Sequence, residues 1–453
     1  MTAPASRPRP ARRAIDDLSL TIERDDLEHR LTNLALGDLD DRLAALGAYE
    51  ALPAESNQLY TPYIDLRAAR LEAAAIDWEP DSRLVPAVLP DDADGLLVLS
   101  EGDVVGSALS DAARDAGVEF TTIADYLDRT PDRARELLAA ATLPADDKFA
   151  QLTRALWTQG VVLDVPNGVR LEKPIIIRWA VGAPDRAVLT RTFVRLGENA
   201  DAAVVEELVA SDASISGSTQ AFFAGTTEVS LGAGASLRVA SLQELPASVV
   251  AIQHRAAQVG EGASLQWALA QLGGRLVRSR VDNRLVGDRS SVEQVEIVFG
   301  GDEQMFDLTS YTTHVGRDTT GDLLSKGALL DRARAYMKGL IIIDKSARGT
   351  DSFLGEFGMN LSKGARSVAI PSLEIDQPDC RRAAHSSSVG PIDEAQLFYL
   401  ESRGIPPDEA RKFIVLGFLE PVVARVPLAA AQDRLRELLE DKWTAGLGGE
   451  AAA

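Results

Sequence analysis

Cysteine is nearly absent from this chain of 453 residues, in which Cys380 is the only one. One thiol cannot form an intrachain disulfide, a zinc knuckle or a complete cysteine-ligated iron–sulfur site. Any soft-metal chemistry of this chain must therefore use ligands that another chain supplies.

Positive charge is also scarce. The chain has 47 Lys and Arg against 68 Asp and Glu, a formal net charge of −21. Sequence-independent nucleic-acid binders and proteins held on anionic lipid need a basic surface, so the charge argues against both. The longest apolar runs are far shorter than the roughly 20 residues of a membrane span. No apolar signal region follows the arginine-rich start. We expect a cytoplasmic protein with no nucleic-acid or membrane partner.

Catalytic and nucleotide-binding motifs are missing as well. The sequence has no G-x-x-x-x-G-K-[ST] phosphate loop, no G-x-G-x-x-G after a strand, no H-E-x-x-H and no G-x-S-x-G. The chain is therefore not itself a P-loop ATPase, and a self-contained enzyme is disfavoured.

What is present divides into four segments. Residues 1–13 predict a disordered tail, with a nucleic-acid-binding arm as the alternative. Residues 14–156 predict a helical or mixed α/β region, because apolar residues recur at three- and four-residue spacing and residues 96–99 suit a short strand. The pattern of residues 392–453 predicts a C-terminal helical region, which we expect to cover the exposed end of the β-rich segment that precedes it. Its first helix spans residues 393–404 and closes with Gly404 as its C-cap.

Between these helical regions, residues 157–391 consist of short β-branched runs separated by Gly, Asn, Asp and Ser, the signature of strands and turns. A glycine motif recurs at residues 197, 232, 260, 287 and 316, with spacings of 35, 28, 27 and 29. A near-constant period of this length predicts a mainly β fold with a β-helix (solenoid) core, in which glycine supplies a positive φ at each corner. An ordinary β-sandwich is the alternative.

Few residues suggest a site. His254 and His314 fall on expected strands, where structural hydrogen bonds are favoured. His385 lies five residues after Cys380, in an expected loop, and both are metal-ligand types. On spacing alone a structural role is still favoured for this pair. Alternating charges at residues 275, 278, 280, 282 and 284 suit the polar face of a strand, or the acid–base row of a β-helix enzyme that acts on polysaccharide.

Three stretches near the C-terminus resemble one known family. They are the segment at 371–375, the run His-Ser-Ser-Ser-Val-Gly at 385–390, and residues 392–405 with the later Leu-Gly-Phe-Leu-Glu-Pro-Val at 416–422. Together they are similar to the C-terminal signature of the SufB/SufD family of iron–sulfur cluster assembly scaffolds.

The resemblance implies a β-helix core with helical flanks, no enzymatic activity, and a complex with a SufB-like paralogue and a SufC-like ABC ATPase. It implies that the ATPase docks on the C-terminal helices, where the candidate residues are Phe398, Arg403, Gly404, Phe418 and Glu420. The resemblance does not decide whether the isolated chain forms a homodimer or whether the complex binds a flavin.

Three departures from SufB point to SufD. The chain has Leu400 where SufB-like chains have a cysteine, Ser386 where they have a glutamate, and no counterpart of their sulfur-accepting cysteine. In SufD the histidine at the His385 position is expected to face a SufB cysteine across the interface, where a transient iron–sulfur cluster forms. Many SufD chains carry a cysteine at the position of Ala383, so Cys380 is the nearest candidate thiol. A SufB-type scaffold that holds a cluster alone is the alternative.

Overall fold

The computed structural model describes residues 28–30, 32, 39–63, 65–66, 69, 75–139, 142–214 and 219–450. The tail expected at 1–13 lies outside these residues, as does most of the helical pattern expected before residue 39. No helix in the described part is long and apolar enough to cross a membrane.

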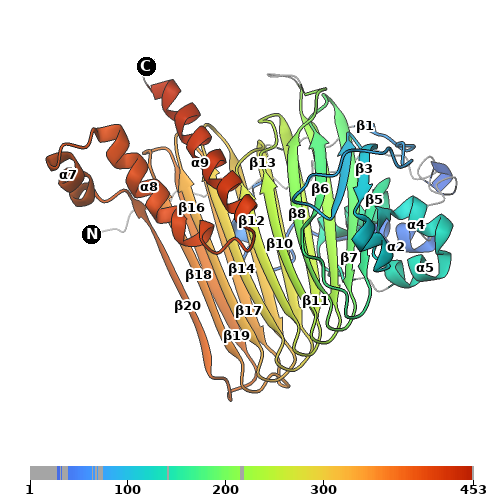
Figure 1. Ribbon diagram of the computed structural model, residues 1–453. Coiled ribbons are helices and arrows are strands. Elements are labelled where there is room, and N and C mark those ends of the chain that lie inside the picture. The colour runs from blue at the N-terminus through green and yellow to red at the C-terminus, as the bar shows by residue number, and fades with distance from the viewer. Residues whose placement is uncertain are drawn as a thin grey trace, which may run out of the picture.

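The elements follow the expected order of a mixed N-terminal region, a long series of strands and C-terminal helices (Figure 1). The N-terminal region comprises α2 (Leu39–Ala51), η1 (Thr61–Tyr63), β1 (Ala75–Ile76), β2 (Gly95–Ser100), β3 (Asp103–Leu109), α3 (Asp111–Asp115), β4 (Glu119–Thr122), α4 (Ile123–Arg129), α5 (Pro131–Ala139) and α6 (Lys148–Leu156). The C-terminal helices are α7 (Glu394–Ser402), α8 (Pro407–Val423) and α9 (Ala429–Glu450). Gly404 has a φ of 87° just after α7, as its predicted C-cap role requires.

The central strands form the predicted β-solenoid of about eight turns, between residues 159 and 391. Odd-numbered strands build sheet A: β5 (Gln159–Val165), β7 (Arg186–Leu196), β9 (Ala221–Leu231), β11 (Val249–Val259), β13 (Leu276–Leu285), β15 (Met305–His314), β17 (Arg334–Ile343) and β19 (Arg366–Ile375). Even-numbered strands build sheet B: β6 (Ile175–Val181), β8 (Asp201–Ala210), β10 (Ser236–Gln243), β12 (Ser264–Gln271), β14 (Ser291–Gly300), β16 (Thr320–Leu329), β18 (Asp351–Asn360) and β20 (Arg382–Pro391).

The strand register confirms the period that the glycines predicted. In sheet B, Asp201 pairs with Ser236, Ser236 with Ser264, Ser264 with Ser291 and Ser291 with Thr320. Successive turns are therefore offset by 35, 28, 27 and 29 residues, the spacings of the recurring glycines.

The reason for those glycines differs from the expected one. None of the five has a positive φ; the left-handed residue comes two positions later, as in Asn199, Gly234 and Arg289. The glycines are instead needed because each packs against the backbone of the preceding turn. A Cβ on Gly260 would lie 2.6 Å from the carbonyl oxygen of Leu231, and one on Gly232 would lie 2.8 Å from the Glu198 nitrogen. Close backbone approach, not corner conformation, selects glycine here.

The solenoid has one lumen, which is lined mainly by apolar side chains, and two covered outer faces. Trp179, Phe223 and Trp267 are among the large side chains that fill the lumen. The outer face of sheet A is covered by α2 and α6 over its first strands. The outer face of sheet B is covered by α8 and α9, which lie across β10 to β16 in Figure 1. At the N-terminal end both sheets finish in antiparallel pairs, β2 with β3 and β4 with β5.

Candidate functional site

The C-terminal end of the solenoid is open. Among the described residues, β19 and β20 are the last strands of their sheets, and no further strand pairs with their outer edges. His385 lies on β20, which pairs with β18 over its full length. The expectation that His385 sits in a loop is therefore wrong, because residues 382–391 form the last strand of the solenoid.

His385 and Cys380 both border the lumen at this open end. His385 pairs in register with Leu354, a buried lumen residue, and aligned residues of parallel strands face the same side of a sheet. Cys380 precedes β20 and packs against the same lumen cluster, which includes Leu323, Ile341 and Leu354. The thiol is partly buried and the histidine is exposed. The fold thus brings the two sequence-predicted ligands to one mouth of the solenoid.

The surroundings of this mouth carry balanced charge. Arg382 forms an ion pair with Asp351 at 2.6 Å, and Arg381 pairs with Asp318. Below the rim, Glu356 pairs in register with Ser387 and points into the lumen. Burial raises the pKa of Glu356 to about 8, against the opposing effect of the hydrogen bond that the Ile370 N–H donates to it. A neutral carboxyl group therefore lies behind the open end near pH 7.

These residues cannot complete a metal site by themselves. No group of three or more His, Cys, Asp or Glu side chains within the described ranges is arranged to hold a metal ion. One imidazole and one thiol supply at most two ligands, whereas the common cysteine-ligated clusters use four. The open end could therefore contribute to a cluster only together with another chain.

The predicted partner-binding residues of the C-terminal helices divide into two groups. The first group lies on and after α7, a helix without a buried residue. Phe398 is 73% exposed, and the Arg403 guanidinium lies 5.2 Å from the ring centre of Tyr399. Phe413 on α8 is also largely exposed. Large exposed aromatic side chains are typical of protein interaction surfaces, so this group remains available to a partner.

The second group belongs to the packing of α8. Phe418 is half-buried, its ring centre lies 4.6 Å from the Lys326 amine, and its carbonyl oxygen accepts a hydrogen bond from that amine at 2.7 Å. These contacts hold α8 on β16. Glu420 is exposed and accepts a hydrogen bond from Arg436 of α9 at 2.8 Å. Of this pair, Glu420 has the more exposed side chain.

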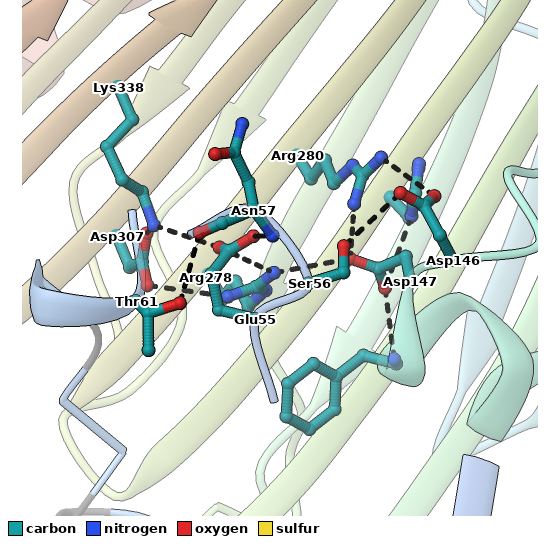
Figure 2. Close-up of polar contacts among 12 residues, drawn as sticks. Glu55, Ser56, Asn57, Thr61, Asp146, Asp147, Arg278, Arg280, Asp307 and Lys338 are labelled. Atoms are coloured by element: carbon teal, nitrogen blue, oxygen red, sulfur yellow. Dashed lines mark hydrogen bonds and ion pairs between the residues drawn. The ribbon is translucent and has the colours of Figure 1, made fainter. Parts of the chain in front are cut away.

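A second cluster of ionisable residues, which the sequence did not reveal, lies on the outer face of sheet A (Figure 2). It joins strand residues to acids of the N-terminal region. We call it the buried ion cluster; its members are Glu55, Asp147, His254, Arg278, Arg280, Asp282, Asp307 and Lys338. Arg278 and Arg280 come from the charged row that the sequence placed on a polar strand face, but both are buried. Arg275 and Arg284, at the ends of the row, are exposed. The middle of the row is therefore buried, and the five residues do not form one continuous accessible acid–base surface.

Asp147 is the centre of one half of this cluster. Its Oδ1 caps α6 by accepting hydrogen bonds from the backbone N–H groups of Phe149 and Ala150. Its Oδ2 accepts hydrogen bonds from Arg280 at 3.0 Å and Arg278 at 3.2 Å. Burial alone would raise the pKa of Asp147, but Arg280, His254 and Arg278 outweigh it and hold the pKa well below its usual range.

Lys338 is the centre of the other half. Its amine is fully buried, 2.6 Å from Asp307 Oδ1 and 3.5 Å from Glu55 Oε2. Figure 2 shows Glu55 reaching this amine from the segment that crosses the strands. Because the cluster contains four acids and four basic side chains, it has no excess charge with which to hold an ionic ligand. The buried ion cluster is therefore a clamp that fastens the N-terminal region to sheet A.

The comparisons with known proteins agree with this architecture. The family model for the SufBD core domain of the SUF system of iron–sulfur cluster assembly matches residues 179–418. The chain belongs to the SufBD family. The matched residues run from β6 into α8, so they include the open end and α7 but exclude the N-terminal acids Glu55 and Asp147.

Curated relatives support the same family. The chain is 29% identical to the iron–sulfur cluster assembly protein SufD of Bacillus subtilis over 337 residues, which cover 74% of this chain and 76% of the relative. It is 26% identical over 342 residues to a SufBD family protein of Staphylococcus epidermidis, covering 76% of this chain and 72% of the relative. The resemblance drawn from the C-terminal motifs is thereby confirmed at the level of the family.

Proposed function

We propose that this chain is a SufD-like, non-catalytic scaffold subunit that assists iron–sulfur cluster assembly at an interface with a SufB-like paralogue. The observation that carries the proposal is the open end of the solenoid, where His385 and Cys380 border a lumen mouth beside two strand edges that no other described strand pairs with. An unpaired edge is a template for a strand of another chain. The paralogue then supplies the ligands that one imidazole and one thiol lack.

The single thiol favours a SufD-like over a SufB-like role. A self-sufficient scaffold must hold the cluster alone, and this chain offers one cysteine. The departures at Ser386 and Leu400 from the SufB pattern point the same way. Weak, shared ligation suits a cluster that is cargo and must be released.

We further propose that a SufC-like ABC ATPase docks on α7 and the adjoining face of α8. Phe398, Tyr399 and Phe413 support this placement because they are the large apolar side chains that these helices leave exposed. Glu420 lies on the same helix as Phe413 and supplies a polar contact at the rim. Phe418 acts indirectly, by holding α8 on the solenoid.

The first test is cluster formation in the reconstituted complex. Co-expression with a SufB-like and a SufC-like partner should yield a complex that gains iron–sulfur absorbance on anaerobic reconstitution with iron and sulfide. His385→Ala should lower the absorbance per complex, while Ser388→Ala on the same strand should not. An unchanged yield in His385→Ala would remove that residue from the site, and absence of any complex would contradict the SufD-like assignment.

The second test is the edge itself. Ser387→Lys with Val389→Lys adds charge to β20 in exposed positions and should weaken association with the SufB-like partner by more than tenfold. The control is Val105→Lys, an exposed position on β3 at the N-terminal end of the solenoid. Equal loss in both variants, or in neither, would show that the partner does not use the open edge. Sedimentation velocity on the purified proteins separates these outcomes.

A further inference from the structure

An exposed apolar stretch lies beside β3, at the end of the solenoid opposite α7 (Figure 1). Its large side chains are Leu84, Val85 and Val88, of which Val88 is 90% exposed. The stretch is held along β3, because the Ser107 N–H donates a hydrogen bond to the Val85 carbonyl oxygen at 2.6 Å. We call residues 84–88 the N-terminal patch. The iron–sulfur function proposed above makes no use of it.

Acidic residues flank this patch on both sides in the sequence. Residues 77–103 contain eight Asp and Glu against one Arg. Three of these acids, Glu79, Asp91 and Asp92, are exposed and form no ion pair with another described residue, and we call them the rim acids. The Lys173 amine reaches only the backbone carbonyl oxygen of Asp91, at 2.7 Å. An apolar surface between exposed acids fits an occupant that is both apolar and basic.

The first residues of this chain have that composition. Residues 1–13 carry four arginines and no acid, and residues 15–22 contain four Ile and Leu. Residues 7–22 therefore combine four large apolar side chains with a net charge of +2, from four Arg and two Asp, in a protein whose net charge is −21. They lie outside the described residues, and the function proposed above leaves them without a role.

The described chain begins close to the patch. The Arg30 guanidinium lies 5.7 Å from the ring centre of Trp78, which precedes Leu84 by six residues. Six residues span at most about 20 Å, whereas the chain from residue 13 to residue 28 can span about 50 Å. The basic residues can therefore reach the patch. Covalent attachment beside it also gives them an effective concentration that a separate chain rarely attains.

We propose that residues 7–22 of this chain bind the N-terminal patch, with their arginines at the rim acids and their apolar side chains on Val85 and Val88. The occupant is the chain's own segment because it is tethered beside the patch, whereas a second copy or a separate protein is not. The contact lies at the surface, so salt screens its ionic part. This proposal does not depend on the iron–sulfur function.

The direct test is zero-length cross-linking of amines to carboxylates in the full chain. Arg9→Lys with Arg12→Lys keeps the positive charge and supplies two amines that a carbodiimide can couple to acids. We expect mass spectrometry to find cross-links from these two positions to the rim acids within one chain. Mixing isotope-labelled and unlabelled chains identifies cross-links between copies. Cross-links that are absent, spread over acids elsewhere in the molecule, or formed only between copies would overturn the proposal.

Amide hydrogen exchange gives a second test at low salt. Asp91→Asn with Asp92→Asn weakens the rim, so exchange at residues 84–88 should become at least about threefold faster as the covering segment leaves. The matched control is Asp302→Asn with Glu303→Gln, two adjacent exposed acids after β14, which lies six strands of sheet B from β3. Unchanged exchange in the rim variant, or an equal increase in the control, would contradict the proposal.

Discussion

Both outer faces of the solenoid have an apolar cover, but the cover of sheet A adds the buried ion cluster. Over β13 to β17, sheet A meets the N-terminal region through the buried ion cluster, with Asp147 and Glu55 contributing the covering acids. Over β10 to β16, sheet B meets α8 and α9 through apolar side chains such as Leu419, Leu439 and Trp443. The Trp443 ring stacks on Phe299 of β14, with ring centres 6.4 Å apart.

Apolar packing and buried ion pairs contribute differently to the stability of a cover and to the precision with which it is placed. Apolar burial contributes roughly 25 cal/mol per Å² and depends little on exact side-chain placement. A buried ion pair contributes little net stability, because desolvation offsets most of the attraction, but breaking one partner is costly. We infer that buried apolar surface stabilises the C-terminal helices on sheet B. The ion cluster instead determines where the N-terminal region sits on sheet A.

Removing the central acid of the ion cluster should have the largest effect. Asp147→Ala leaves Arg278 and Arg280 buried without that acid, which costs about 3–5 kcal/mol, and it removes the cap of α6, for about 1 kcal/mol more. Urea unfolding followed by circular dichroism measures the loss. The control is Asp146→Ala. The Asp146 side chain is 63% exposed, so its loss should lower the free energy of unfolding by less than about 1 kcal/mol. Similar losses in both variants would show that the clamp is not centred on Asp147.

Truncating a buried leucine on the apolar side should cost somewhat less and act locally. Leu419→Ala removes a fully buried side chain of α8 and should cost about 2–5 kcal/mol. Faster amide hydrogen exchange confined to α8 and α9 would report it. Phe413→Ala, on the same helix but 63% exposed, should leave the exchange unchanged. Faster exchange in the N-terminal region as well would mean that the two covers are coupled.

Raising the pH from 7 to 9 should weaken the docking of the N-terminal region on sheet A and strengthen the docking of α9 on sheet B. Burial lowers the pKa of His254, but its contacts with Asp147 and Asp282 outweigh burial and raise the pKa above 6.5. A raised pKa gives stability that is present below pH 6.5 and lost as the pH rises through the folded value. The N-terminal cover should therefore loosen.

On the other face, burial lowers the pKa of Lys442 of α9 to about 7, partly opposed by Asp302. The lowered pKa means that docking of α9 is weakest at and below pH 7 and strengthens as the pH rises toward 10.5. Hydrogen exchange at both pH values, corrected for the intrinsic rate, should show more opening near α6 and less near α9. A parallel change at both places would contradict the assignment of these two groups. His254→Gln and Lys442→Met should each remove one of the two responses.

The smallest effect on stability should come from the exposed pair between α8 and α9. Glu420→Ala removes an ion pair in which both side chains are at least 40% exposed, so the loss should stay below about 1 kcal/mol. The same change should weaken binding of a SufC-like partner if Glu420 lies in the docking surface. Arg436→Ala is the control, because it breaks the same pair without removing Glu420. Equal binding by both variants would place Glu420 outside that surface.

Local patterns in the sequence predicted most of the fold. The glycine spacing matched the strand register, and the predicted Gly404 follows the end of α7 with a positive φ. These features depend on nearest-neighbour backbone contacts, which leave a regular trace in one sequence. The physical role of the glycines was misassigned, because close contact between turns is a property of stacked backbones and not of any single corner.

The sequence patterns predicted only part of the candidate site. His385 and Cys380 stay predictions as ligands, and the strand that carries His385 was taken for a loop. The buried ion cluster was missed because Asp147 and Arg280 are 133 residues apart and no local spacing links them. An aspartate directly before a helix was the one available signal, and it indicates a cap rather than a partner.

The sequence by itself determined the repeat length of this protein and the number of thiol ligands that it can offer to a metal. Both follow from residue identity alone, since only glycine tolerates the contact between turns and only one thiol is present. The tertiary structure decided which charges are buried and which strand edges stay open. Those properties depend on which distant side chains meet, because burial and pairing arise only when the chain has closed around them.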